Sequence, residues 1–149
     1  MPDGSVSNTV PTNSFKSLHS GKTEDEILDL IEASSVPPAA TDIKRIQDTA
    51  FPSDRVFRDA WETVGNTIRE NMGKARVIHT DHINKIKDRE MKSRVNQIVI
   101  QEAMGQDATV LKSEIQGIQT AIDNVGPNIN AAGTPAILKA VWPAGLPTE

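Results

Sequence analysis

The sequence contains no cysteine and no tyrosine, and only five of its 149 residues are aromatic. Without cysteine the chain can form neither disulfides nor thiolate zinc sites, and thiol chemistry is excluded. The apolar fraction of 37% is below the usual level of globular proteins, which leaves little material for a large core. No apolar run approaches the roughly 20 residues that span a bilayer, so we expect no membrane contact.

Strong charge and catalytic motifs are also missing. The net charge of −4 gives no reason to expect nucleic acid binding by the protein as a whole. The opening Met-Pro-Asp-Gly-Ser lacks the basic and apolar regions of a signal peptide, so we expect synthesis in the cytoplasm. There is no nucleophile elbow, phosphate-binding glycine loop or dinucleotide fingerprint. We therefore predict a protein without catalytic residues or a cofactor.

The longest regular pattern is a proline-free stretch from Asn71 to Met104. Asn71 can cap a helix start, and Gly105 is a typical helix stop. The pattern predicts one helix of roughly 33 residues, on the order of 50 Å long. A compact globule of this chain length is only about 38 Å across. The helix must therefore protrude from a small core or lie along a partner. Its apolar residues recur at helical spacing: Ala75, Ile78, Ile83, Ile86, Met91, Val95 and Ile98.

A second helix is predicted from Ala108 to about Val125, capped by Asp107. Its stripe has coiled-coil spacing: Leu111, Ile115, Ile118, Ile122 and Val125. The short connection makes the two helices antiparallel neighbours. With about 18 residues, the second helix covers only the C-terminal half of the first. The other half must be covered by the Phe57–Trp61 segment or by a second chain.

The N-terminal third predicts a small strand–helix–strand part. Residues 1–22 are polar and predict an extended arm or an edge strand, with Ser5 to Val10 as the candidate strand. Thr23-Glu24-Asp25-Glu26 is a capping box that starts a helix ending near Ala33. Ile43 to Ala50 has the pattern of a short strand.

Two of the few aromatic residues lie in the next segment. A helix is predicted from Arg55 to about Val64, with Phe57, Ala60 and Trp61 on one face at the centre of the core. Gly65-Asn66 ends it, and Thr67 to Glu70 is either a strand or a turn.

The C-terminal part predicts a loop and a last short helix. Gly126-Pro127 and Asn128 to Gly133 form the loop, and Thr134-Pro135 starts a helix that Pro143 ends. Its apolar face comprises Ile137, Leu138, Val141 and Trp142. This helix is either a docking tip, with the tryptophan as its main contact, or a lid folded back on the hairpin.

These elements predict an α+β protein that is mostly α. Residues 1–22 form the arm or edge strand, and 23–66 form the small α+β part with the Phe57/Trp61 helix. Residues 67–126 form the long helical hairpin, and 127–149 form the loop, the C-terminal helix and a tail.

Two features of the long helix suggest ligands. His79 and His82 flank Asp81, but a metal site needs three or four ligands, so we predict no metal and histidines that face solvent or a partner. Seven basic residues outnumber four acidic ones between Lys74 and Glu102. A phosphate-binding helix has this balance, but so does a solvated face laced with ion pairs, or one that binds an acidic protein.

Three segments resemble a known family: Pro52–Trp61, Asn71–Asp81 and Thr134–Pro143. In combination they resemble a motif of small proteins from the tail-gene clusters of tailed bacteriophages, labelled tail-fibre assembly or tail assembly chaperone-like. The Pro-Asp-Gly-Ser-Val opening and the Thr-Glu-Asp-Glu box also lie where that family has such segments. The resemblance implies a location in a phage tail, fibre or baseplate, and it brings no catalytic residues.

The first functional hypothesis is a non-enzymatic component of a phage tail, bound through its hairpin to a fibre or baseplate protein or to copies of itself. It is expected in the host cytoplasm during synthesis and in the virion after assembly. One alternative is a transient tail-fibre assembly chaperone, and another is a nucleic-acid-binding protein using the basic helix. The residues expected to form the partner contact or the core are Phe57, Trp61, Ile78, Ile83, Ile86 and Trp142.

Overall fold

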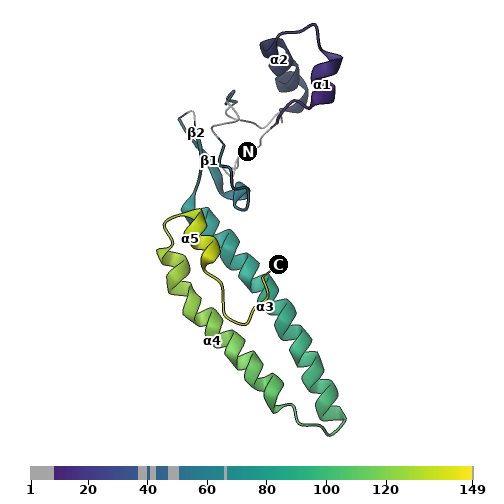
Figure 1. The fold of residues 1–149 in the computed structure, drawn as a ribbon, viewed down its shortest axis with the longest axis vertical. Coiled ribbons are helices and arrows are strands. Elements are labelled where there is room, and N and C mark those ends of the chain that lie inside the picture. The colour runs from purple at the N-terminus through teal and green to yellow at the C-terminus, as the bar shows by residue number, and fades with distance from the viewer. Residues whose placement is uncertain (1–8, 37–39, 41–42, 47–50, 66, 149) are drawn as a thin grey trace. The chain divides into compact units, whose positions relative to one another are not determined.

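The computed structural model describes residues 9–36, 40, 43–46, 51–65 and 67–148 (Figure 1). The chain divides into two compact units, Met1–Ser53 with Trp61–Arg69, and Asp54–Ala60 with Glu70–Glu149. The described residues are mostly helical and include one two-stranded antiparallel sheet, which confirms the predicted fold class.

The first unit contains two short helices, α1 (Asn13–Leu18) and α2 (Glu24–Ser35). The prediction of an extended arm up to residue 22 is wrong, because the Thr12 hydroxyl accepts a hydrogen bond from the Phe15 amide and starts α1. Most of the candidate strand Ser5 to Val10 lies outside the described residues. The capping box of α2 is confirmed, since Thr23 and Glu26 each bond the other's backbone amide.

Arg45 is bound to one face of α2 and does not belong to a strand. Its guanidinium donates to Glu32 at 2.8 Å and to Asp29 at 2.5 Å, and it lies 3.7 Å from Asp25. These hydrogen bonds raise the pKa of Arg45 above its ordinary value. Residues 43–46 have no regular secondary structure, which corrects the strand predicted from Ile43; its continuation through 47–50 lies outside the described residues.

A β-hairpin replaces the helix predicted from Arg55 to Val64. Only a single 3₁₀ turn, η2 (Arg58–Ala60), forms before strand β1 (Trp61–Val64), and β1 pairs with β2 (Thr67–Glu70). The strands are rich in β-branched residues, and Gly65 has a positive φ of 62° in the connection, which suits a tight hairpin turn. Trp61 therefore does not share a helix face with Phe57. The strand alternative for Thr67 to Glu70 is confirmed.

The second unit is built on a helical hairpin of α3 (Met72–Ala103) and α4 (Thr109–Ala131). The long helix is confirmed almost to the residue. The Asn71 side chain accepts from the Lys74 amide, and Gly105 takes a positive φ of 71° at the end. Asp107 accepts from the Thr109 amide just before α4, so it lies one residue ahead of the capping position.

Helix α4 runs through Gly126 and Pro127, where a loop was predicted. Gly126 has no Cβ to clash with the ring of the following proline, which removes part of the usual obstacle. The extra turns bury Ile129, and the guanidinium of Arg76 donates to the carbonyl of Ala132 at 2.8 Å. The stabilisation from burying Ile129 and from this cap outweighs the loss of the backbone hydrogen bond that Pro127 cannot donate.

The last helix, α5 (Pro135–Ala140), begins as predicted with Thr134 as its cap. Of its expected apolar face, Leu138 is fully buried, but Ile137 is 54% exposed, which corrects its assignment to that face. Lys139 makes an ion pair with Asp54, which ties α5 to the segment that precedes η2.

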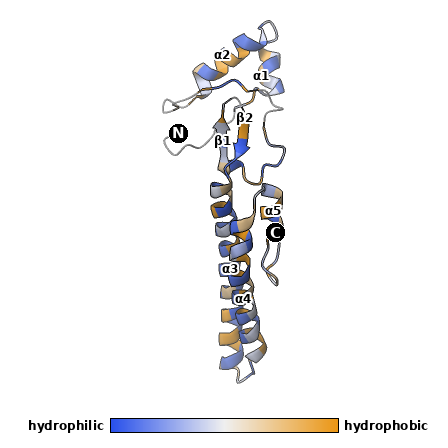
Figure 2. Cartoon of the chain, turned by 90° about the vertical axis from the view of Figure 1, so that its left-hand side faces the viewer, coloured by the Kyte–Doolittle hydropathy of each residue, from blue (hydrophilic) through white to orange (hydrophobic). Residues whose placement is uncertain are grey.

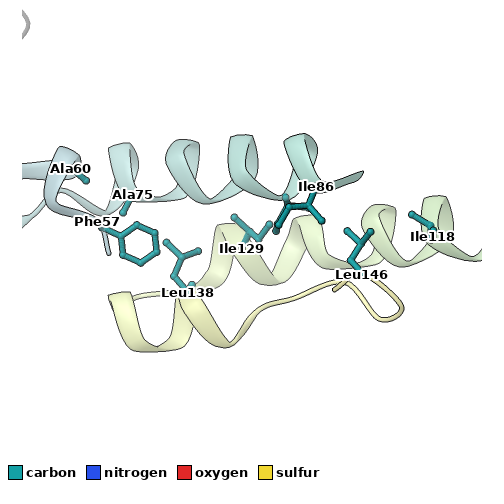
Figure 3. Packing of buried hydrophobic residues seen from close by; sticks show 10 residues of the cluster. Phe57, Ala60, Ala75, Ile86, Ile118, Ile129, Leu138 and Leu146 are labelled. Carbon is teal, nitrogen blue, oxygen red and sulfur yellow. The ribbon is translucent and has the colours of Figure 1, made fainter. Parts of the chain in front are cut away.

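The core of this unit lies between α3, α4, α5 and the C-terminal tail (Figure 3). Phe57 and Ala60 of the η2 segment close one end of it. Helix α3 supplies Ala75, Ile83 and Ile86, and α4 and the chain after it supply Ile118, Ile129, Ala132, Leu138 and Leu146. The core therefore occupies the half of the hairpin that includes the start of α3.

Candidate protein-binding surface of the hairpin

The structure places the six predicted contact or core residues in three settings. Phe57, Ile83 and Ile86 are buried in the core, each about 2% exposed. Ile78 and Trp142 are half-buried and pack against that core. Trp61 is buried in β1, in the other unit, and its indole N–H has no acceptor among the described residues.

The apolar N-terminal half of α3 is covered within the chain. Helix α4 has 23 residues and reaches Ile129, and Leu138 and Leu146 pack in the same core cluster as Ala75, Ile83 and Ile86. The expectation that α4 leaves this half bare is therefore wrong, and its cause is the unexpected passage through Pro127. Any partner surface must be sought elsewhere on the hairpin.

His79 fastens the C-terminal segment to α3. Its ring is 5% exposed, and Nε2 lies 2.8 Å from the carbonyl oxygen of Val141, to which it donates as the neutral Nε2–H tautomer or as the cation. The ring also meets Phe57 and Trp142 edge to face, at centroid distances of 6.0 and 5.9 Å. This burial corrects the prediction that His79 faces solvent or a partner. These contacts of Trp142 match the prediction that the last helix is a lid folded back on the hairpin, and not the prediction of a docking tip.

An ionic layer crosses the middle of the hairpin. Arg94 of α3 donates to Glu90 at 2.7 Å and to Glu114 of α4 at 3.1 Å. The side chains of Arg94 and Glu90 are only 21% and 23% exposed. Bonding to Glu90, and then to Glu114, raises the pKa of Arg94. Part of the apparent basic charge of α3 is thus neutralised within the hairpin.

A groove of about 240 Å³ runs between α3 and α4. Its apolar residues are Ile83, Ile122, Val125 and Ile129, and its polar residues are Thr80, Asn84 and Asn130, with Gly126 between them. None of these residues is charged. The volume is below the range of about 300–1,000 Å³ that is usual for small-molecule sites. Its size and lining suit an apolar side chain presented by another helix.

Helical spacing continues this face toward the hairpin connection. Met91, Val95 and Ile98 follow Asn84 at spacings of seven, four and three residues, which place them on the same face of α3. Met91 and Ile98 are half-buried, and Val95 is 47% exposed. The face that bears the groove therefore carries accessible apolar side chains over much of α3.

The end of the hairpin carries a second apolar surface, which we call the tip patch. Its members are 47% to 71% exposed: Val95, Val99, Ile100, Met104 and Val110. In Figure 2 the α3 end remote from α5 includes segments coloured as hydrophobic. Four of these five residues were not singled out by the sequence pattern, which followed only the seam facing α4. The absence of any charge from Val95 to Gln101 is the signal that could have found them.

Other kinds of site find little support in the described part of the chain. There, no three histidine, aspartate or glutamate side chains gather as a metal site would require. Nor does any helix within those residues combine the length and hydrophobicity needed to cross a membrane. His79 and His82 both meet the Trp142 ring, at centroid distances of 5.9 and 5.6 Å, and so serve packing.

Comparison with known proteins gives no relative: no protein family, curated protein or solved structure matches the chain.

Proposed function

We propose that this protein is a non-enzymatic structural component of a bacteriophage tail, attached to a tail fibre or baseplate protein through its helical hairpin. The place in a phage tail rests on the resemblance of Pro52–Trp61, Asn71–Asp81 and Thr134–Pro143 to the tail-cluster proteins. The mode of attachment rests on the groove between α3 and α4.

The groove supports docking of a helix more than binding of a substrate. Its apolar residues accept an aliphatic or aromatic side chain, and its hydroxyl and amide groups can bond a partner's polar atoms. Because none of its lining residues is charged, it offers neither a general acid nor a general base. The partner contact is therefore a helix laid along the α3–α4 face, with one anchor side chain in the groove.

The proposal predicts presence in mature particles. Quantitative mass spectrometry of purified virions should detect the chain at a small multiple of the tail symmetry. A chain that is abundant in the infected lysate and absent from virions would be the transient assembly chaperone instead. In that case a soluble complex with an unassembled fibre should be recovered from the lysate.

A matched pair of variants tests the groove itself. Asn130→Arg places a charged side chain at the groove, whereas Asn128→Arg places the same group about 200° away around α4. Both asparagines are exposed and lie in the last four residues of the helix, where a positive charge interacts favourably with the helix dipole. We expect Asn130→Arg to lose incorporation into particles and Asn128→Arg to retain it. Equal incorporation of both would exclude the groove as the attachment site.

Nucleic acid binding is the second alternative. The pairing of Arg94 with two glutamates, and of Lys87 with Asp88, leaves less basic charge on α3 than the sequence suggests. Binding to phosphates would weaken about 10³-fold or more between 50 and 200 mM salt if it used six contacts. A titration of duplex DNA at both salt concentrations distinguishes this alternative.

A further inference from the structure

Helix α3 changes character along its length. Between Lys85 and Arg94, seven of ten residues are charged, whereas the segment Val95 to Gln101 carries no charge at all. Within this uncharged segment the apolar residues are Val95, Ile98, Val99 and Ile100. The charged segment of α3 is thus suited to contact with water, whereas the uncharged segment near its end is not.

Most apolar side chains at this end project away from the side of Ile98. At 100° per residue, Val95 and Val99 project on one side of Ile98, and Ile100 projects almost opposite to it. Ile98 is half-buried, while Val99 and Ile100 are 60% and 59% exposed. Exposed apolar side chains that gather on one part of a surface commonly mark a protein contact. Helix α4 covers one side only, so the rest of the tip patch requires another cover.

We propose that the tip patch, formed by Val95, Val99, Ile100, Met104 and Val110, binds the tip patch of a second copy of this chain. The contact is an isologous one around a two-fold axis, between the ends of two hairpins. It goes beyond the proposed attachment to a tail protein and does not depend on it, because it concerns the chain alone; the two surfaces share only Val95.

The charges at the tip favour a copy over a charged partner. Lys112 bonds Glu102 at 2.7 Å across the hairpin, so these two charges are neutralised within one chain. Asp107 accepts from the Thr109 amide and hydroxyl. An acidic or basic partner would therefore gain little here.

The polar side chains at the tip suit a self-complementary contact. Asn96, Gln97 and Gln106 are exposed, and each amide both donates and accepts hydrogen bonds. Two identical surfaces of this kind can satisfy one another around a two-fold axis, whereas a surface of single-sign charge could not.

The size of the patch predicts a weak dimer. Transfer energies for aliphatic side chains imply that the five residues still expose on the order of 300 Å² of apolar side chain. Two copies double that area, and with the usual polar share the interface reaches about 1,000 Å², near the lower limit for specific association. We therefore expect a dissociation constant of roughly micromolar order.

Sedimentation velocity of the full chain over a range of concentrations tests the proposal. The matched variants are Val99→Lys and Val77→Lys, because both valines lie on α3, are 60% and 61% exposed, and lie outside the end turns where the helix dipole acts. We expect Val99→Lys to weaken dimerisation at least about tenfold, since a valine leaves each side of the contact. Val77→Lys should change it less than about twofold.

Each other outcome would overturn the proposal. A wild-type chain that stays monomeric up to about 500 μM lacks the predicted affinity. Loss of the dimer in Val77→Lys with retention in Val99→Lys would place the contact near the start of α3, away from the tip patch. Far-ultraviolet circular dichroism serves as the control for folding. A change toward β signal upon association would show strand pairing of the uncharged Val95–Gln101 segment instead of docking of folded tips.

Discussion

The Nε2 atom of His79 lies 2.8 Å from the carbonyl oxygen of Val141, and this hydrogen bond joins residues 62 positions apart. It holds the end of α5 on α3, next to the edge-to-face contacts of the same ring with Phe57 and Trp142. The Trp142 indole in turn donates to the Leu146 carbonyl at 3.1 Å, and this bond helps to hold the tail against the core. The imidazole of His79 thus adds to the Lys139–Asp54 ion pair and the buried Leu138 in holding the C-terminal segment on the core.

His79→Ala should therefore destabilise the fold by about 2–4 kcal/mol, through a cavity and a carbonyl without its donor. His82→Ala is the matched control, because that ring also meets Trp142 but is only half-buried. Thermal unfolding measures the difference, and hydrogen exchange should show faster exchange confined to residues 134–146. Equal effects of the two variants would mean that the bond to Val141 contributes nothing.

The glycines of α4 give a second test. Gly117 and Gly126 both lie inside the helix, and a Cβ at either would meet nothing within 4 Å outside the neighbouring residues. Gly117→Ala should stabilise the protein by about 0.5–1 kcal/mol, because alanine loses less backbone entropy on forming a helix.

Gly126→Ala should increase the free energy of unfolding less than Gly117→Ala does, since its new Cβ would crowd the ring of Pro127. Urea unfolding of both variants decides the point. A larger gain at position 126 would show that the missing Cβ is not what lets the helix pass the proline.

The sequence predicts an element correctly where its local signals are strong and self-contained. Asn71 and Gly105 bracket α3 as expected, and the capping box at Thr23 and the Thr134-Pro135 start both occur. Each of these is set by one or two side chains that bond their own backbone, so nothing distant needs to be known.

Errors arose where tertiary packing overrode a local preference. Pro127 is a strong helix breaker, yet burial of Ile129 and Ala132 keeps α4 intact beyond it. That extension decides which half of α3 is covered, and so the binding face predicted from the sequence is wrong. Substituting Ile83→Asp and Ile86→Asp should unfold the chain, because both residues lie in the core.

Acid should weaken the link between α5 and the η2 segment. The ion pair with Lys139, and then the bond from the Val56 amide, lower the pKa of Asp54 below its ordinary value. The unfolded state therefore binds this proton more readily, so the contribution is complete above about pH 4 and is lost as the pH falls through the lowered value.

Asp54→Asn removes that contribution, so its unfolding midpoint should fall less than that of the wild type between pH 5 and pH 3. The slope should shrink without disappearing, because Glu26 and Asp107 also have lowered pKa values, from bonds with Thr23 and Thr109. Parallel curves for the two proteins would show that Asp54 makes no net contribution to the acid sensitivity.

The ionic layer of the hairpin offers the sharpest test of its packing. Arg94→Ala leaves Glu90 half-buried without its closest cation and should cost about 1–2 kcal/mol, a value reduced for the partial exposure of the pair. Arg89→Ala is the control on the same helix, because Arg89 is 59% exposed and lies 3.7 Å from Glu90. It should change the free energy of unfolding by less than about 0.5 kcal/mol.

The double variant Arg94→Met with Glu90→Leu replaces charge by apolar surface and should regain at least the wild-type stability, since both desolvation penalties disappear. The double variant would also extend the apolar seam toward the tip patch, and if the layer sets the register of α4 against α3, that register should then shift. Chemical denaturation measures the stability, and the relative exchange rates of the Glu114 and Ile118 amides report the register. If Arg94→Ala costs no more than Arg89→Ala, the layer is solvated and α4 is aligned by its isoleucines alone.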